Sequence, residues 1–135
     1  IVPQTPSYMA WLGGVDGQDE HTDNNLVDSI YQDVTVPAGT TKVVLTGYYD
    51  VATEESGSTV YDRGSLSIMQ NGTVLETVLS LTNATPTADW TAINYTLTHD
   101  VAGQTIRVFM TSSNDVTNPT SFYFDSFVLT ATYCP

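Results

Sequence analysis

The stretch Ser121-Phe122-Tyr123-Phe124-Asp125-Ser126-Phe127-Val128-Leu129 is strongly apolar and carries one carboxylate in its middle. Phe, Tyr, Val and Leu at this density predict a β-strand that is buried on at least one face. An ionised carboxylate there needs a cation or several hydrogen-bond donors, because an unpaired buried charge is strongly unfavourable. The chain sets only Lys42, Arg63 and Arg107 against fifteen acidic residues. We therefore expect a bound metal ion, with calcium as the candidate, as the partner of Asp125.

Outward from this stretch, the chain reads as a series of short strands separated by turn residues. A helical period of 3.6 residues is nearly absent, whereas Val, Ile, Thr and Tyr recur in short runs. The expected strands are residues 8–13, 29–36, 41–50, 64–70, 73–81, 90–98, 104–111 and 121–129. Asn71-Gly72 between two alternating runs is a strong hairpin signal. About eight strands with such turns predict an all-β fold, an antiparallel two-sheet β-sandwich of the jelly-roll type.

Composition limits the classes of partner. At 135 residues, the chain has the length of one domain, and we expect residues 1–135 to form it. Its net charge of −12 argues against nucleic acid and anionic membrane surfaces, and no long apolar segment predicts membrane insertion. Only 13% of residues are charged, against about 25% in typical globular proteins, and Thr, Ser and Asn suit an extracellular surface. Together with the start at Ile1 and a lone Cys134, this indicates a piece excised from a longer secreted protein.

The acidic loop at residues 16–25 is a candidate metal site. Calcium takes six to eight oxygen ligands, and this loop supplies Asp, Glu, Asn and Gly. Its spacing does not fit an EF-hand, and a solvated acidic loop is the competing interpretation. Asp125 favours calcium, because the final strand would bring a distant carboxylate to the same area. The candidate ligands are Asp16, Asp19, Asp23 and Asp125.

Aromatic side chains are the candidates for contact with a ligand such as a sugar. Trp11 and Trp90 accompany strand-like runs, and we expect both in the core. Tyr48, Tyr49 and Tyr61 flank the polar loop at residues 52–62 and are better candidates for an exposed platform. Plain packing of tyrosines on the faces of a sandwich is the alternative.

Catalytic motifs are weak throughout the sequence. No Gly-x-Ser-x-Gly elbow surrounds a serine, and the two histidines and the terminal cysteine show no zinc spacing. Carboxylate pairs can be nominated almost anywhere in so acidic a chain, so they carry little weight. We predict no catalytic residues and no enzymatic activity, with a hydrolase as the lesser alternative.

An ordered set of motifs resembles a known family. Its members are Ala10-Trp11-Leu12-Gly13-Gly14, Asp89-Trp90, and the segments at residues 32–39, 61–68, 100–108 and 122–129. Together they resemble the jelly-roll accessory domains, of the galactose-binding or carbohydrate-binding-module type, that are appended to secreted bacterial proteases and other exoenzymes. Each motif alone is weak, and the order across nearly the whole chain carries the likeness.

The resemblance implies a fold and a role. In such domains a structural calcium often lies where the early loop meets the last strand, and the aspartate of that strand, here Asp125, is commonly a ligand. Sugar sites vary among relatives, so no sugar-contacting residue is transferred. We expect a secreted, non-catalytic domain that binds carbohydrate or a cell-surface glycan beside a neighbouring catalytic domain of its parent protein. A structural, adhesive or protein-docking module without a small ligand is the alternative.

Overall fold

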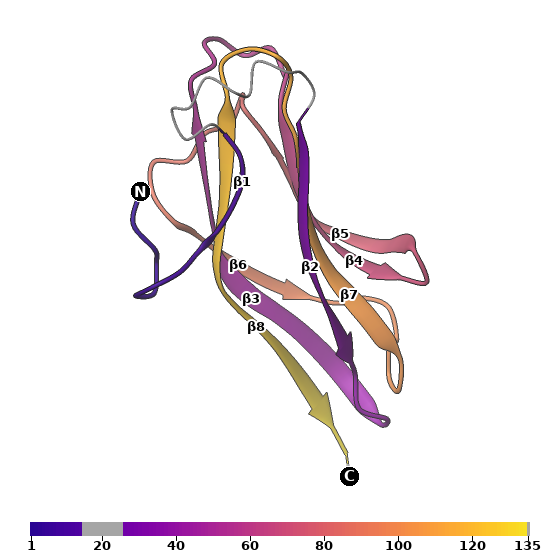
Figure 1. Ribbon diagram of the computed structural model, residues 1–135. Coiled ribbons are helices and arrows are strands. Elements are labelled where there is room, and N and C mark those ends of the chain that lie inside the picture. Colours follow the sequence, from indigo (N-terminus) through magenta and orange to yellow (C-terminus); the bar gives the residue numbers. More distant parts are fainter. Residues whose placement is uncertain (15–25, 135) are drawn as a thin grey trace.

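Eight strands form two four-stranded antiparallel sheets in the computed structural model, which describes residues 1–14 and 26–134 (Figure 1). Sheet A has the strand order β1-β8-β3-β6, and sheet B has the order β2-β7-β4-β5. The strands are β1 (Ala10–Gly13), β2 (Val27–Thr35), β3 (Thr40–Thr53), β4 (Arg63–Gln70), β5 (Thr73–Thr82), β6 (Thr91–Thr96), β7 (Thr105–Ser113) and β8 (Thr120–Tyr133). The predicted antiparallel two-sheet sandwich is confirmed.

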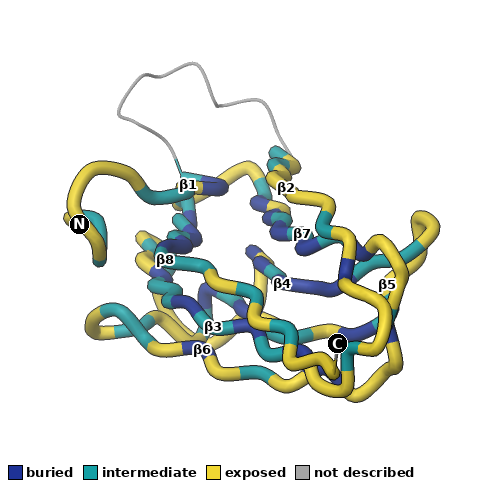
Figure 2. The backbone as a smooth tube through the Cα atoms, turned by 90° about the horizontal axis from the view of Figure 1, so that it is seen from below, coloured by how far each residue is buried: buried dark blue, intermediate teal, exposed yellow. Residues whose placement is uncertain are grey.

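The core lies between the two sheets, and most of its side chains point inward because side chains alternate between the two faces of each strand. Along β7, the side chains of Ile106, Val108 and Met110 are buried, while the residues between them are half-buried on the outer face. This is the period of two that a strand imposes. Figure 2 shows buried segments on strands of both sheets, while the turns and chain ends are mostly exposed.

Phe122 joins the two sheets at the centre of the core. Its side chain is fully buried, and its ring lies directly over Gly64 of β4 in the opposite sheet. A Cβ atom at Gly64 would lie 2.5 Å from Cδ1 of that ring, closer than nonbonded carbons approach. The absent side chain at Gly64 therefore makes the space that Phe122 fills.

A bulge in β8 changes which of its side chains face the core. Phe124 faces inward, Ser126 has a φ of 57°, and Phe127 again faces the core side. The register of β8 against β3 shifts at this point, between the partners of Thr46 and Tyr48. Because an extra residue in a strand reverses the alternation, Phe127 faces the core although it lies three residues after Phe124. Asp125 directly follows the inward Phe124, so ordinary alternation places it on the outer face of sheet A.

The predicted hairpin is confirmed at Asn71-Gly72. Both residues have positive φ, 51° and 75°, as a two-residue type I′ turn requires. Gln70 and Thr73 pair across the turn. The turn projects beyond the end of the β4–β5 ladder (Figure 1).

The two side edges of the sandwich differ. At the β5–β6 edge, the buried Glu76 of β5 accepts hydrogen bonds from the amide of Thr98, at 2.7 Å, and from its hydroxyl. His99 Nδ1 lies 3.3 Å from the same carboxylate oxygen, so Glu76 ties sheet B to the chain that follows β6. At the opposite edge, β1 pairs with β8 only over residues 121–124.

In the described part of the chain, no helix has the length and apolar character needed to cross a membrane.

Candidate functional site

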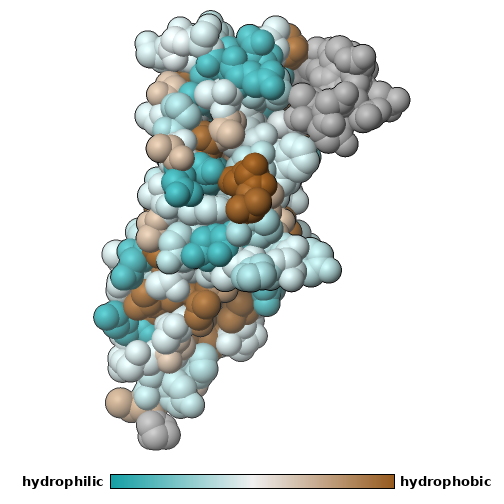
Figure 3. Space-filling view, turned by 90° about the vertical axis from the view of Figure 1, so that its left-hand side faces the viewer, coloured by the Kyte–Doolittle hydropathy of each residue, from teal (hydrophilic) through white to brown (hydrophobic). Residues whose placement is uncertain are grey.

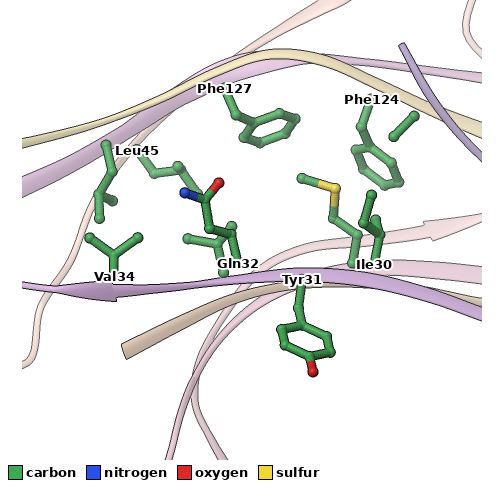
Figure 4. A pocket seen from close by; sticks show the side chains of 11 residues that line it. Ile30, Tyr31, Gln32, Val34, Leu45, Phe124 and Phe127 are labelled. Carbon is green, nitrogen blue, oxygen red and sulfur yellow. The ribbon is translucent and has the colours of Figure 1, made fainter. Parts of the chain in front are cut away.

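The outer face of strands β2 and β7 combines an exposed aromatic ring with charged side chains. Alternation along β2 turns Tyr31 and Asp33 outward, and Figure 4 shows Tyr31 pointing away from the space between the sheets. The antiparallel register places Asp33 opposite Arg107 and Tyr31 opposite Phe109. Four side chains from two distant parts of the sequence thus share one surface, which we call the β2–β7 face.

Arg107 organises this surface. Its Nε donates to Asp33 Oδ1 at 2.7 Å, and its second guanidinium nitrogen donates to Oδ2 at 3.0 Å. The guanidinium carbon also lies 3.6 Å from the centre of the Tyr31 ring, a cation–π contact. The hydrogen bonds from Arg107 hold the pKa of Asp33 below its ordinary value, and Asp33 raises the pKa of Arg107. The pair therefore stays ionised and oriented while it is exposed to solvent.

A pocket of about 240 Å³ adjoins the ion pair. The Asn71-Gly72 turn forms part of its wall, and Gln70 donates a hydrogen bond to the side chain of Gln104 nearby. The pocket is lined by Asp33, Met69, Gln70, Asn71, Gly72, Thr105, Ile106 and Arg107. Its volume lies below the usual range of roughly 300–1,000 Å³ for drug-sized ligands, so it suits one small ring or a chain end. The pocket lining supplies hydrogen-bond donors and acceptors, whereas the Tyr31 ring contacts the guanidinium of Arg107 and is not a lining residue.

A second aromatic surface lies on sheet A. The rings of Trp11 and Tyr123 stack with their centres 6.1 Å apart, and Trp11 is 44% exposed. The indole of Trp11 donates to Ser121 Oγ at 3.0 Å. The prediction that Trp11 lies in the core is wrong, because Leu12 takes the inward position of β1 and the alternation turns Trp11 outward. The same prediction for Trp90 is also wrong, since Trp90 is half-buried outside the core and its indole donates to the carbonyl of Val2.

The three predicted ligand-binding tyrosines do not form one platform. Tyr49 packs against the core from the inner face of β3. Tyr48 follows the opposite alternation and pairs in register with Asp125 on the outer face of sheet A. Tyr61 is 49% exposed in the segment before β4, where its amide donates to Asn83 Oδ1 at 2.9 Å. Figure 3 shows the side of the molecule where sheet A lies, with apolar patches on a mostly polar surface.

Asp125 is buried beneath the N-terminal segment and is hydrogen-bonded there. Thr5 donates to it twice, from its amide to Oδ2 and from its hydroxyl to Oδ1, each at 3.1 Å. The amide of Ser126 also donates to Oδ1. Burial alone would raise the pKa of Asp125, but the amides of Thr5 and Ser126 and the Thr5 hydroxyl outweigh it and lower that pKa. The protein itself thus supplies several of the donors that this carboxylate needs.

The other predicted metal ligands, Asp16, Asp19 and Asp23, lie outside the described residues. Within residues 1–14 and 26–134, no three His, Cys, Asp or Glu side chains gather as a metal-binding group. Several oxygens beside Asp125 are nevertheless of the kind that calcium takes. The hydroxyl of Ser126 lies 2.8 Å from Gln4 Oε1, 3.1 Å from Thr5 Oγ1 and 3.3 Å from Asp125 Oδ1.

A further buried carboxylate, which the sequence did not single out, lies where loops meet at one end of the sandwich. Asp62 is fully buried and accepts from the amide of Asp115 at 2.8 Å and from the hydroxyl of Thr120 at 2.6 Å. Thr53 lies 2.8 Å from Thr120 and accepts in turn from the amide of Glu55. This relay fixes the relative positions of the loops around residues 55, 62 and 115.

Comparisons with known proteins identify the architecture. No protein-family model and no curated protein matches the chain. Among solved structures, it is similar to TmCBM61 in complex with β-1,4-galactotriose, with a TM-score of 0.53 and 12% identity over 90% of this chain and 88% of that one. Weaker similarities, each with a TM-score of 0.41, are to a CBM4 structure (16% identity, 90% of this chain and 94% of that one) and to infectious bursal disease virus (10% identity, 98% and 31%).

CBM stands for carbohydrate-binding module, the type of domain that the sequence motifs resemble. At 12% identity, the similarity to TmCBM61 establishes the fold alone, and the two weaker similarities add no argument. The chain is thus a jelly-roll β-sandwich, as its sequence predicted.

Proposed function

We propose that this chain is a non-catalytic carbohydrate-binding module and that the β2–β7 face is its sugar site. The observation that carries the proposal is the arrangement of Tyr31, Arg107 and Asp33, which places an oriented ion pair beside an exposed aromatic ring. Aromatic rings can pack against the C–H faces of sugar rings, and fixed polar groups can hydrogen-bond their hydroxyls. The jelly-roll fold shared with TmCBM61, which was solved with β-1,4-galactotriose, supports the same class of ligand.

The ion pair favours neutral sugars over acidic ones. Arg107 already uses two nitrogens on Asp33, so an anionic sugar would have to displace the Asp33 carboxylate. Two neighbouring hydroxyl groups of a neutral sugar can instead donate to Asp33 and accept from the remaining guanidinium N–H groups. The pocket of about 240 Å³ beside the pair would hold one ring.

The sugar site is tested by calorimetric titration of neutral oligosaccharides, with β-1,4-galactotriose first, into the protein and matched variants. Tyr31→Ala should weaken binding about tenfold or more, equivalent to roughly 1.4 kcal/mol. Tyr8→Ala, at a tyrosine that is 87% exposed in the N-terminal segment, is the control and should bind as the wild type does. Failure to bind any glycan in a broad panel would reject the function. If Tyr31→Ala binds sugar normally and Tyr61→Ala or Trp11→Ala loses sugar binding, the sugar site lies at Tyr61 or Trp11 instead of the β2–β7 face.

The proposal includes a structural calcium ion near Asp125. The carboxylate of Asp125 and the oxygens of Gln4, Thr5 and Ser126 are suitable ligands, and Asp16, Asp19 and Asp23 are the further ligands expected from the sequence. The ion would brace the N-terminal segment against β8.

We also place the domain outside the cell, as an accessory module that holds a neighbouring catalytic domain on its glycan. The low charged fraction and the Thr- and Ser-rich surface support this placement.

A further inference from the structure

A cleft between the sheets opens at the edge formed by β2 and β8. It has a volume of about 430 Å³, and we call it the inter-sheet cleft. It is lined by Ala10, Ile30, Tyr31, Gln32, Val34, Leu45, Val108, Met110, Phe124, Phe127 and Leu129. Figure 4 shows Phe127, Leu45 and Phe124 on one side of this space and Val34, Gln32 and Ile30 on the other. Ile30 is 47% exposed although it points between the sheets, so its apolar surface lacks cover.

Sheet A is incomplete beside this cleft. β1 covers β8 only along residues 121–124, and no described strand pairs with the same side of residues 127–133. β2 is likewise the edge strand of sheet B. Two strand edges therefore border one apolar cleft. At the opposite edge of the sandwich, hydrogen bonds from Thr98 to Glu76 join sheet B to the chain that follows β6.

The free edge of β8 presents backbone groups that can pair with another strand. Leu97 N donates to Val43 O at 2.9 Å, so Val43 directs its backbone groups toward the β6 side of β3. Ala131 is opposite Val43, and Leu129 is opposite Leu45. In an antiparallel pair, the partners of such residues direct their own N–H and C=O groups away from the shared ladder. Leu129 and Ala131 therefore offer these groups at the free edge.

Among residues 1–14 and 26–134, none of the usual protections against pairing is found at this edge. Natural edge strands commonly carry Lys or Pro, a bulge, or a covering loop. Residues 127–133 of β8 contain no charged residue and no proline, and the bulge lies before them. Apolar side chains on their inner face, including Phe127 and Leu129, line the cleft. Such an edge is a ready template for a further strand.

The strands around the cleft also define the charge of a suitable partner. β1, β2 and β8 carry three carboxylates, Asp28, Asp33 and Asp125, and no Lys, Arg or His. Arg107 of the neighbouring β7 pairs with Asp33, so the net charge of −12 of the whole chain, rather than these three groups alone, favours a cationic partner. Among the described lining residues none is charged, and Gln32 is the one amide that points into the cleft. A second copy of this chain would bring the same acidic strands and a net charge of −12, so electrostatics disfavour it.

We propose that the free edge of β8 binds an extended segment of another protein, which adds to sheet A as a further strand. Its backbone pairs with Leu129 and Ala131, and alternate apolar side chains fill the inter-sheet cleft near Ile30. One inward position beside Gln32 takes a polar side chain. Lys or Arg at its ends complements the net charge of −12 of this chain. In this mode of recognition, backbone hydrogen bonds give affinity and the alternating pockets give selectivity.

The test uses a labelled synthetic peptide of about nine residues, the length of a typical strand, with Val or Leu alternating with Thr and Lys at both ends. Fluorescence anisotropy should show saturable binding, and hydrogen exchange should show protection of the Leu129 and Ala131 amides. Ala131→Pro removes an N–H that the β3–β8 ladder does not use, and Ile30→Lys places a cation in the cleft. Each should weaken binding about tenfold or more. Val74→Lys, at an equally exposed valine on edge strand β5, is the matched control and should bind normally.

Several results would overturn the proposal. One is equal binding of a scrambled peptide with adjacent apolar residues, or of a peptide with Glu in place of Lys. Another is a complete lack of peptide binding by the folded wild type. Concentration-dependent dimerisation that Ala131→Pro abolishes would assign the edge to a second copy. Binding of the dye 1-anilinonaphthalene-8-sulfonate that Ile30→Lys abolishes and the peptide does not displace would assign the cleft to a small apolar ligand.

Discussion

Adding one methyl group at Gly64 tests how tightly the two sheets pack around Phe122. In Gly64→Ala, the new Cβ would lie 2.5, 2.8 and 2.9 Å from three atoms of a ring that is fully buried. The backbone of Gly64 does not have positive φ, so the cost arises from this overlap rather than from backbone strain. Overpacking of this kind costs about 1–3 kcal/mol. At roughly 4 °C per kcal/mol for a chain of this size, the melting temperature should fall by about 4–12 °C.

Gly47→Ala is the matched control, because it also adds a methyl group under an aromatic ring. Its Cβ would lie 3.0 Å from Phe127, but that ring is half-buried and borders the inter-sheet cleft, where it has room to move. Calorimetry or urea denaturation should show a loss below about 1 kcal/mol, since Gly→Ala also restricts the unfolded chain. Combining Gly64→Ala with Phe122→Leu should recover part of the loss. A Gly64→Ala protein as stable as wild type, or a larger loss in Gly47→Ala, would refute the reasoning.

Three further predictions concern the buried carboxylates. Burial would raise the pKa of Glu76, but hydrogen bonds from Thr98 and the contact with His99 outweigh it and lower that pKa, so the stabilisation is present above the unfolded value of 4.5. It is lost as pH falls through the lower folded value, and melting curves between about pH 6 and pH 3 should fall less steeply for Glu76→Gln. Chelator should lower the melting temperature of the wild type, added calcium should restore it, and Asp125→Ala should abolish this response. An unchanged melting curve with chelator would contradict the calcium proposal. Asp62→Ala should cost about 2 kcal/mol or more in urea denaturation, because the buried Thr120 hydroxyl and the half-buried Asp115 amide lose their acceptor.

Local patterns predicted the strands well, because their causes lie within a few residues. The alternation of Ile106, Val108 and Met110 is the period of a strand with one buried face, and the structure buries all three. Asn71-Gly72 predicted its turn because both residues tolerate positive φ. The apolar character of residues 121–129 likewise predicted the strand that is now seen to extend from Thr120 to Tyr133.

Pairing between distant strands was not available from those patterns. Asp33 and Arg107 meet because β2 and β7 are neighbours in one register, and nothing near either residue encodes that neighbour. The bulge at Ser126 was not predicted, because residues 121–129 look like one uninterrupted strand in the sequence. The outward position of Tyr31 follows from alternation along β2, so the aromatic part of the β2–β7 face could have been predicted from the sequence.

The position of β8 within sheet A has a consequence for how the protein folds. The final strand lies between β1 and β3, and Thr40 of β3 pairs with Tyr133 at the far end of the chain. During synthesis, β1 has no sheet A neighbour until β8 leaves the ribosome, and β3 has only β6. Contacts between segments so far apart in sequence are slow to form, because a long loop must close before they stabilise anything. Sheet A should therefore form slowly and only after β8 has been synthesised, and a nascent chain that ends before Thr120 should stay open to proteases.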